Sequence, residues 1–146
     1  MLIEQARVED IAQLAALLRL LFSQEADFQP DLQKQERGLH TIIKSPEVGR
    51  IFVARDGDKV IGMVNLLFTI STAEGGPVCL LEDMIVHPDH RGGTGSRLLQ
   101  YAIDFARASG FVRITLLTDQ TNAGAIQFYK RHGFTPSEMT ALRLSL

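Results

Sequence analysis

The sequence predicts an α/β (α+β) fold, in which helices flank both faces of a mixed, mostly antiparallel β-sheet. Apolar residues recur at helical spacing over residues 11–22 and 98–106, and short apolar runs bounded by turn residues lie between them. Glycine-containing turn signals join successive runs, as expected for antiparallel hairpins. The 146 residues suit one hydrophobic core, so we expect a single domain over residues 1–146.

The first third of the chain is predicted to hold one strand and two helices. Residues 2–6 read as a short strand, and Asp10 is a candidate N-cap for a helix with one apolar face. Asp31 is a candidate cap for a second helix, which should end near Pro46 because the residue before a proline disfavours helical backbone.

The rest of the chain alternates strands and helices after a three-strand stretch. Two strands, over residues 51–54 and 60–68, flank an Asp56-Gly57 hairpin signal, and a third follows over residues 78–86 after Gly75-Gly76-Pro77. The remaining elements are a helix that stops at Gly110, a strand over residues 112–117, a helix from Asn122 to Gly133 and a final strand over residues 140–146.

Composition narrows the class of protein. The chain is 45% hydrophobic and 22% charged, which is ordinary for a soluble globular protein. A net charge of -2 gives no electrostatic reason to expect a nucleic acid partner. The sequence has no basic stretch followed by an apolar one at its start and no apolar run long enough to span a bilayer. We therefore expect a cytoplasmic protein with no membrane partner.

Cysteine and histidine usage argues against metal or disulfide chemistry. The single cysteine, Cys79, cannot form an intramolecular disulfide and lies in an apolar run, where a buried inert thiol is expected. The histidines have no metal-site spacing beyond His87-x-x-His90, and this pair lies in a predicted loop. We expect no bound metal, and we expect His87 and His132 at the surface.

A glycine-rich segment between a strand and a helix predicts an anion site. Its core contains three glycines, which allow close backbone approach and positive φ angles. The free N–H groups and partial positive charge of the following helix would attract a phosphate group. The candidate anion-binding residues are Arg91, Gly92, Gly93, Thr94, Gly95 and Ser96.

Two other phosphate-binding loops fit this segment less well. A Walker loop requires a lysine, and the segment contains none. A dinucleotide fingerprint requires a glycine where Leu98 stands, although Asp119 lies where a ribose-binding acid would follow. A dinucleotide-binding protein therefore stays open as a weaker alternative.

A second segment, near the C-terminal end, joins the glycine segment in a recognisable pattern. The residues Asn122, Ala125, Phe128, Tyr129, Gly133 and Phe134 match Asn-x-x-Ala-x-x-Phe/Leu-Tyr-x-x-x-Gly-Phe at every position. In this order, the two segments resemble the acyl-CoA-binding half of the GNAT family, the Gcn5-related N-acetyltransferases. The resemblance implies a GNAT-like fold and transfer of an acetyl group from acetyl-CoA, as co-substrate, to an amine acceptor.

The resemblance also implies roles for individual residues. The backbone of Met84, Ile85 and Val86 would pair with the pantetheine arm, and the glycine segment, one residue shorter than the family pattern, would hold the pyrophosphate. Asn122 would lie near pantetheine, with Ala125 and Phe128 on the same helix. Tyr129 would donate its hydroxyl hydrogen to the departing sulfur of CoA.

Two adjacent acids, Glu82 and Asp83, interrupt the apolar strand before the glycine segment. Side chains alternate along a strand, so the two should face opposite sides. The resemblance implies that an acid here acts as general base for the acceptor amine. Glu82 is our first choice, whereas a β-bulge near this point would favour Asp83.

Two function classes and the oligomeric state remain open. A GNAT-like module without a usable base would bind acyl-CoA and catalyse nothing. The acceptor is not readable, since no motif marks the first two helices or residues 68–77. Apolar strand edges and the apolar segment 140–146 predict a homodimer.

Overall fold

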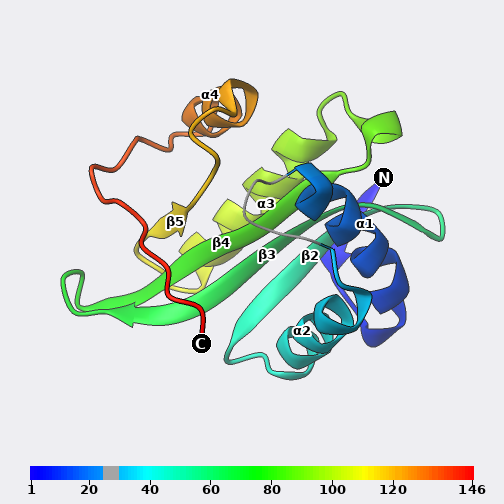
Figure 1. The fold of residues 1–146 in the computed structure, drawn as a ribbon, viewed down its shortest axis with the longest axis horizontal. Coiled ribbons are helices and arrows are strands. Elements are labelled where there is room, and N and C mark those ends of the chain that lie inside the picture. The colour runs from blue at the N-terminus through cyan, green and yellow to red at the C-terminus, as the bar shows by residue number, and fades with distance from the viewer. Residues whose placement is uncertain (25–29) are drawn as a thin grey trace.

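The computed structural model describes residues 1–24 and 30–146, and its centre is a five-stranded sheet in the order β1-β2-β3-β4-β5 (Figure 1). Antiparallel pairing joins β1 to β2, β2 to β3 and β3 to β4, and only β5 runs parallel to its neighbour. The sheet is therefore mixed and mostly antiparallel, as predicted. The strands are β1 (Leu2–Gln5), β2 (Gly49–Asp56), β3 (Lys59–Ser71), β4 (Gly76–Val86) and β5 (Ile114–Leu116).

Helices cover both faces of this sheet, which confirms the predicted layers (Figure 1). One face carries α1 (Ile11–Gln24) and α2 (Leu32–Lys44). The other carries α3 (Thr94–Ala108) and, towards β5, α4 (Ala123–Arg131). Short 3-10 turns, Val8–Asp10 and Pro88–His90, precede α1 and the glycine segment. Among the described residues, no helix combines the length and apolarity needed to cross a bilayer.

The apolar interior forms two clusters, one on each face of the sheet. Removal of this apolar surface from water is the main favourable contribution to folding. The α1 and α2 side includes Leu14, Leu18, Val53, Met63 and Ile85. The α3 and α4 side includes Val64, Leu66, Cys79, Leu81, Leu98, Leu99 and Ala102, with Met84, Phe128 and Tyr129 packed against them.

Two helix starts follow the residue types predicted for them. The carboxylate of Asp31 accepts a hydrogen bond from the Lys34 backbone N–H at 3.1 Å, and the Asn122 side chain accepts one from the Ala125 N–H at 3.0 Å. Asp10 differs, since its carboxylate turns back to the N–H of Arg7 and to the guanidinium of Arg55. It closes the turn before α1 and does not cap α1 itself.

The predicted final strand is wrong. Residues 140–146 form no regular element, and the side chains of Leu142 and Leu144 are 92% and 84% exposed. A strand exists only with a neighbour to complete its hydrogen-bond ladder, and among the described residues none pairs with the outer edge of β5. β5 is three residues long, shorter than the predicted 112–117, because its ladder with β4 extends only over Cys79–Leu81.

Candidate active site

A β-bulge interrupts β4 at the two adjacent acids. Asn65 of β3 lies opposite Asp83, whereas the next residue, Leu66, lies opposite Leu81, so Glu82 is an extra residue in the ladder. The bulge resets the side-chain alternation. Leu81 packs on the α3 side of the sheet, whereas Ile85, two residues after Asp83, packs on the α1 side. Asp83 therefore faces α1.

The two acids occupy different environments as a result. Glu82 is exposed, whereas Asp83 is partly buried, with its carboxylate Oδ2 3.1 Å from the amide Nδ2 of Asn65. Burial raises the pKa of Asp83 to about 6, and the nearby charge of Glu82 acts in the same direction, while the hydrogen bond from Asn65 opposes both. Asp83 thus titrates close to neutral pH, which suits a group that must gain and lose a proton.

The edge of β4 beyond the bulge is open on the side away from β3. β5 pairs with β4 only over Cys79–Leu81, and no strand in the described part of the chain pairs with that edge further along. Met84, Ile85 and Val86 lie on this open stretch while they pair with β3 on their other side. The unpaired backbone groups can bind an extended ligand as an additional strand would.

The glycine segment enters α3 through two left-handed residues. Gly92 and Gly93 have φ angles of 111° and 98°, which side-chain-bearing residues rarely adopt. The hydroxyl of Thr94, the first residue of α3, donates to the carbonyl of His90 at 2.9 Å and fixes the loop. The N–H groups of the first turn, including those of Gly95 and Ser96, have no partners within the helix. Arg91 is exposed beside them.

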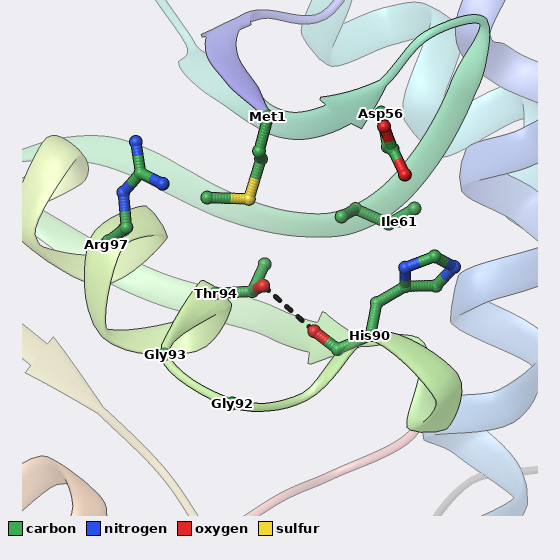
Figure 2. A pocket seen from close by; sticks show the side chains of 8 residues that line it. All are labelled: Met1, Asp56, Ile61, His90, Gly92, Gly93, Thr94 and Arg97. Carbon is green, nitrogen blue, oxygen red and sulfur yellow. Dashed lines mark hydrogen bonds between the residues drawn. The ribbon is translucent and has the colours of Figure 1, made fainter.

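A pocket of about 330 Å³ borders this loop (Figure 2). Met1, Asp56 and Ile61 face Thr94 and Arg97 across it, and Gly92 and Gly93 form its rim. The pocket includes neither Asp83 nor Tyr129. It therefore borders the glycine segment and is separate from the acids on β4.

α4 packs directly against the start of α3. A Cβ atom on Gly95 would lie 3.6 Å from the Phe128 ring and 3.7 Å from the Val86 side chain, so these three residues meet. The ring of His132, at the C-terminal end of α4, lies 3.0 Å from the hydroxyl of Ser96. The two segments singled out in the sequence are therefore in contact.

Tyr129 is held by aromatic rings. Its ring meets Phe128 and Phe134 edge-on, with centroids 5.3 Å and 5.6 Å away, and it packs on the α3-side cluster with Met84. The hydroxyl is the only polar atom of this half-buried side chain, so the packing restricts where it can point. Asn122 and Ala125 lie together in the first turn of the same helix.

Sequence reasoning missed two residues. Asn65 belongs to no motif, although a polar amide within the apolar run 60–68 is itself a signal in the sequence. His132 is partly exposed, in keeping with the surface position expected for it, but its ring also lies 3.0 Å from the Ser96 hydroxyl, a contact that the sequence does not predict. Cys79 is buried as expected, and burial raises the pKa of its thiol to about 11. In residues 1–24 and 30–146, no group of three or more His, Cys, Asp or Glu side chains is arranged to hold a metal ion.

The sequence matches the model of the Acetyltransferase (GNAT) family over residues 12–134. The chain belongs to the GNAT family. The match begins inside α1 and ends at Phe134, so it contains every candidate residue described above. The predicted family and fold are therefore confirmed.

Individual GNAT relatives agree with this assignment. The chain is 33% identical over 136 residues to Uncharacterized N-acetyltransferase YhfO of Bacillus subtilis, covering 90% of this chain and 88% of that protein. It is 28% identical to Aminoalkylphosphonate N-acetyltransferase of Salmonella typhimurium, covering 92% and 85%. The structure of a possible acetyltransferase from Clostridium difficile 630 shares the fold with a TM-score of 0.88 at 17% identity, covering 99% and 97%.

Proposed function

We propose that this GNAT protein transfers an acetyl group from acetyl-CoA to a primary amine of a small molecule or peptide. Transfer would occur by direct attack while both substrates are bound. One observation carries the proposal. The open edge of β4 runs from a partly buried acid, Asp83, towards the glycine segment, and α4, which carries Tyr129, packs on the first turn of the helix that follows this segment.

The residues along this edge fit the parts of acetyl-CoA. The segment from Arg91 to Ser96, which includes the first turn of α3, would supply N–H groups and positive charge for the pyrophosphate. The backbone of Met84, Ile85 and Val86 would bind the pantetheine arm. Val86 and Phe128, which meet at Gly95, join this edge to α4, where Asn122 and Ala125 form the first turn.

We assign the general base to Asp83 in preference to Glu82. Regular alternation of side chains along β4 favours Glu82 as the base. The β-bulge changes this alternation, because it leaves Glu82 exposed and turns Asp83 towards α1. At pH 7, an alkylammonium group with a pKa of about 10.4 is more stable than its neutral amine by ~4.6 kcal/mol. A carboxylate whose pKa is raised to about 6 accepts that proton more readily than one with the usual value of 3.8.

The proposed roles balance the protons of the reaction. Asp83 takes one proton from the ammonium group, and the neutral nitrogen then attacks the thioester carbonyl carbon. As the carbon–sulfur bond breaks, the second nitrogen proton passes to the CoA thiolate or to solvent. Tyr129 donates a hydrogen bond or its proton to the departing sulfur. Full transfer from a phenol of pKa about 10 to a thiolate of pKa about 8.5 is uphill by ~2 kcal/mol, so a strong hydrogen bond serves equally well.

An acceptor screen that follows CoA release tests this proposal. The panel holds aminoalkylphosphonates, because one relative is named for them, together with amino acids, polyamines and peptide N-termini. We expect turnover with at least one amine and none without an acceptor. Acetyl-CoA binding without turnover across the panel would favour a non-catalytic acyl-CoA-binding module, and displacement of acetyl-CoA by NAD would favour a dinucleotide-binding protein.

A further inference from the structure

Asn65 is a polar side chain in an apolar part of β3. It is 2% exposed and stands between Val64 and Leu66, which are fully buried. A buried amide is costly unless its donor and acceptor atoms are hydrogen-bonded. The Asn65 Nδ2 donates to Asp83 Oδ2 at 3.1 Å, but the Oδ1 is sealed from solvent and has no partner among the described residues. The NH2 donor of the amide is therefore hydrogen-bonded, whereas its oxygen acceptor is not.

The chemistry of Asp83 explains why the Oδ1 of Asn65 has no hydrogen-bond partner. An ionised carboxylate only accepts hydrogen bonds, so the NH2 group of Asn65 must face it. A protonated carboxyl also carries an O–H donor, for which the matching partner is an amide oxygen. Rotation of the Asn65 amide by half a turn would present Oδ1 in place of Nδ2. The Oδ1 of Asn65 is thus the matching hydrogen-bond acceptor for Asp83 when Asp83 is protonated.

We propose that Asn65 is a positioning residue that holds Asp83 in both protonation states, with Nδ2 donating to the carboxylate before proton transfer and Oδ1 accepting from the carboxyl after it. This inference rests on the proposed function, in which Asp83 takes the proton of the amine. Direct contact between Asn65 and the acceptor does not fit, because its Oδ1 is sealed whereas Asp83 remains partly exposed.

The charges around the pair are few. Glu82, on the same strand, raises the pKa of Asp83. On the packed elements α1 and β3, the charged side chains are Arg19 and Lys59, both exposed, and β5 has none. α2 packs over β2, and its titratable and charged residues, all exposed, are Lys34, Glu36, Arg37, His40 and Lys44.

Asn65→Leu tests the donor half of the inference, since leucine has nearly the same shape and no polar atoms. A hydrogen bond stabilises a charged group more than a neutral one by roughly 1–1.5 kcal/mol. Loss of the hydrogen bond from Asn65 should therefore raise the pKa of Asp83 and move the acidic limb of the kcat profile up by about one pH unit. The KM for acetyl-CoA should not change. Asn65→Asp, of the same shape, should move the limb further, because two carboxyl groups resist ionising together.

The acceptor half has a readout that does not need turnover. In wild-type protein labelled with ¹³C, the side-chain Cγ resonance of Asn65 should titrate with the same midpoint as the Asp83 carboxyl, because its oxygen gains a hydrogen bond as Asp83 is protonated. In Asp83→Asn this titration should disappear. A wild-type Asn65 resonance that does not follow Asp83 would overturn the inference.

Met63→Leu is the matched control for disturbed packing. Met63 is fully buried two residues earlier on β3 and on the same face, so a change of shape there should leave the pH limb in place. An unmoved limb in Asn65→Leu, or an equal movement in Met63→Leu, contradicts a positioning role. Absence of turnover in the wild type contradicts the proposed function instead, and the Asn65 resonance then decides the inference.

Discussion

The hydroxyl of Ser96 and the ring nitrogen Nε2 of His132 lie 3.0 Å apart, which ties the first turn of α3 to the residue that ends α4. Ser96 belongs to the segment proposed to bind the pyrophosphate, and Tyr129 lies one helical turn before His132. The hydrogen bond therefore sets the position of the proposed acid relative to the proposed pyrophosphate site. Gly95, next to Ser96, makes the second contact between the two segments through Phe128.

Gly95→Asp should weaken acetyl-CoA binding at least tenfold, about 1.4 kcal/mol, because it adds a negative charge to the first turn of α3. Gly95→Asn has the same shape and no charge, so its loss should be smaller. Isothermal titration calorimetry measures both affinities. Gly38→Asp, at an exposed position in α2 with no atom within 4 Å, should bind as the wild type does. Equal affinities for the Asp and Asn variants at Gly95 would remove the charge argument.

Tyr129→Phe should lower kcat at least about tenfold and change the KM for acetyl-CoA little, because the hydroxyl acts as the sulfur departs. Phenylalanine keeps the ring contacts with Phe128 and Phe134, so the fold should be preserved. Steady-state kinetics measure both constants. Tyr101→Phe changes the other tyrosine of the chain, on α3, and should have no effect. Full activity in Tyr129→Phe would assign Tyr129 to packing.

The buried ion pair between Asp10 and Arg55 should dominate acid sensitivity. Burial raises the pKa of Asp10, but the hydrogen bonds and charges of Arg55 and Arg7 outweigh it and leave the pKa below its usual value. The unfolded chain therefore binds a proton that the folded chain does not, and stability is lost as the pH falls below about 4. Asp10→Asn should lose about 3 kcal/mol in urea unfolding at neutral pH, and the difference from wild type should shrink in acid.

Glu4 provides the control for this prediction. It contacts the same guanidinium at 2.8 Å, but its side chain is 35% exposed. Glu4→Gln should therefore cost less than about 1 kcal/mol. Similar losses in the two variants would show that burial of Asp10 is not what makes the pair important.

The C-terminal leucines should mediate self-association. Leu142, Leu144 and Leu146 are exposed and alternate with other residues, as in a strand with one apolar face. The outer edge of β5, which no described strand covers, is a second surface that can pair with another copy of the chain. We expect sedimentation velocity to show a homodimer that the Leu142→Ser, Leu144→Ser double variant converts to monomer. Met139→Ser, an exposed apolar change outside the alternation, is the control. A wild-type monomer at high concentration would end this prediction.

Features decided by local chemistry could be predicted from the sequence. Asp31 and Asn122 cap their helices because a short polar side chain reaches the N–H three residues on. The positive φ angles of Gly110 and Gly133 follow from residue type, and both glycines stand just after a helix as predicted. The glycine segment and the α4 pattern likewise predicted the family.

Features decided by distant pairing could not be predicted. The bulge at Glu82 depends on how β3 and β4 align, so alternation along β4 alone favoured Glu82 over Asp83. The proposed role of Asn65 depends on the strand register, which places it opposite Asp83. The alternation of residues 140–146 predicted a strand that is not formed, because the pattern does not say which partner would pair with it.

The most direct test of the account compares Asp83→Asn with Glu82→Gln in the pH dependence of kcat, using the acceptor found in the screen. We expect wild-type activity to fall on an acidic limb near pH 6, where Asp83 titrates. Asp83→Asn should lose at least about 100-fold at pH 7 and recover towards high pH, where the amine loses its proton unaided. Glu82→Gln should keep its rate and shift the limb slightly downward. The reverse pattern, with Glu82→Gln inactive and Asp83→Asn unaffected, would contradict the account.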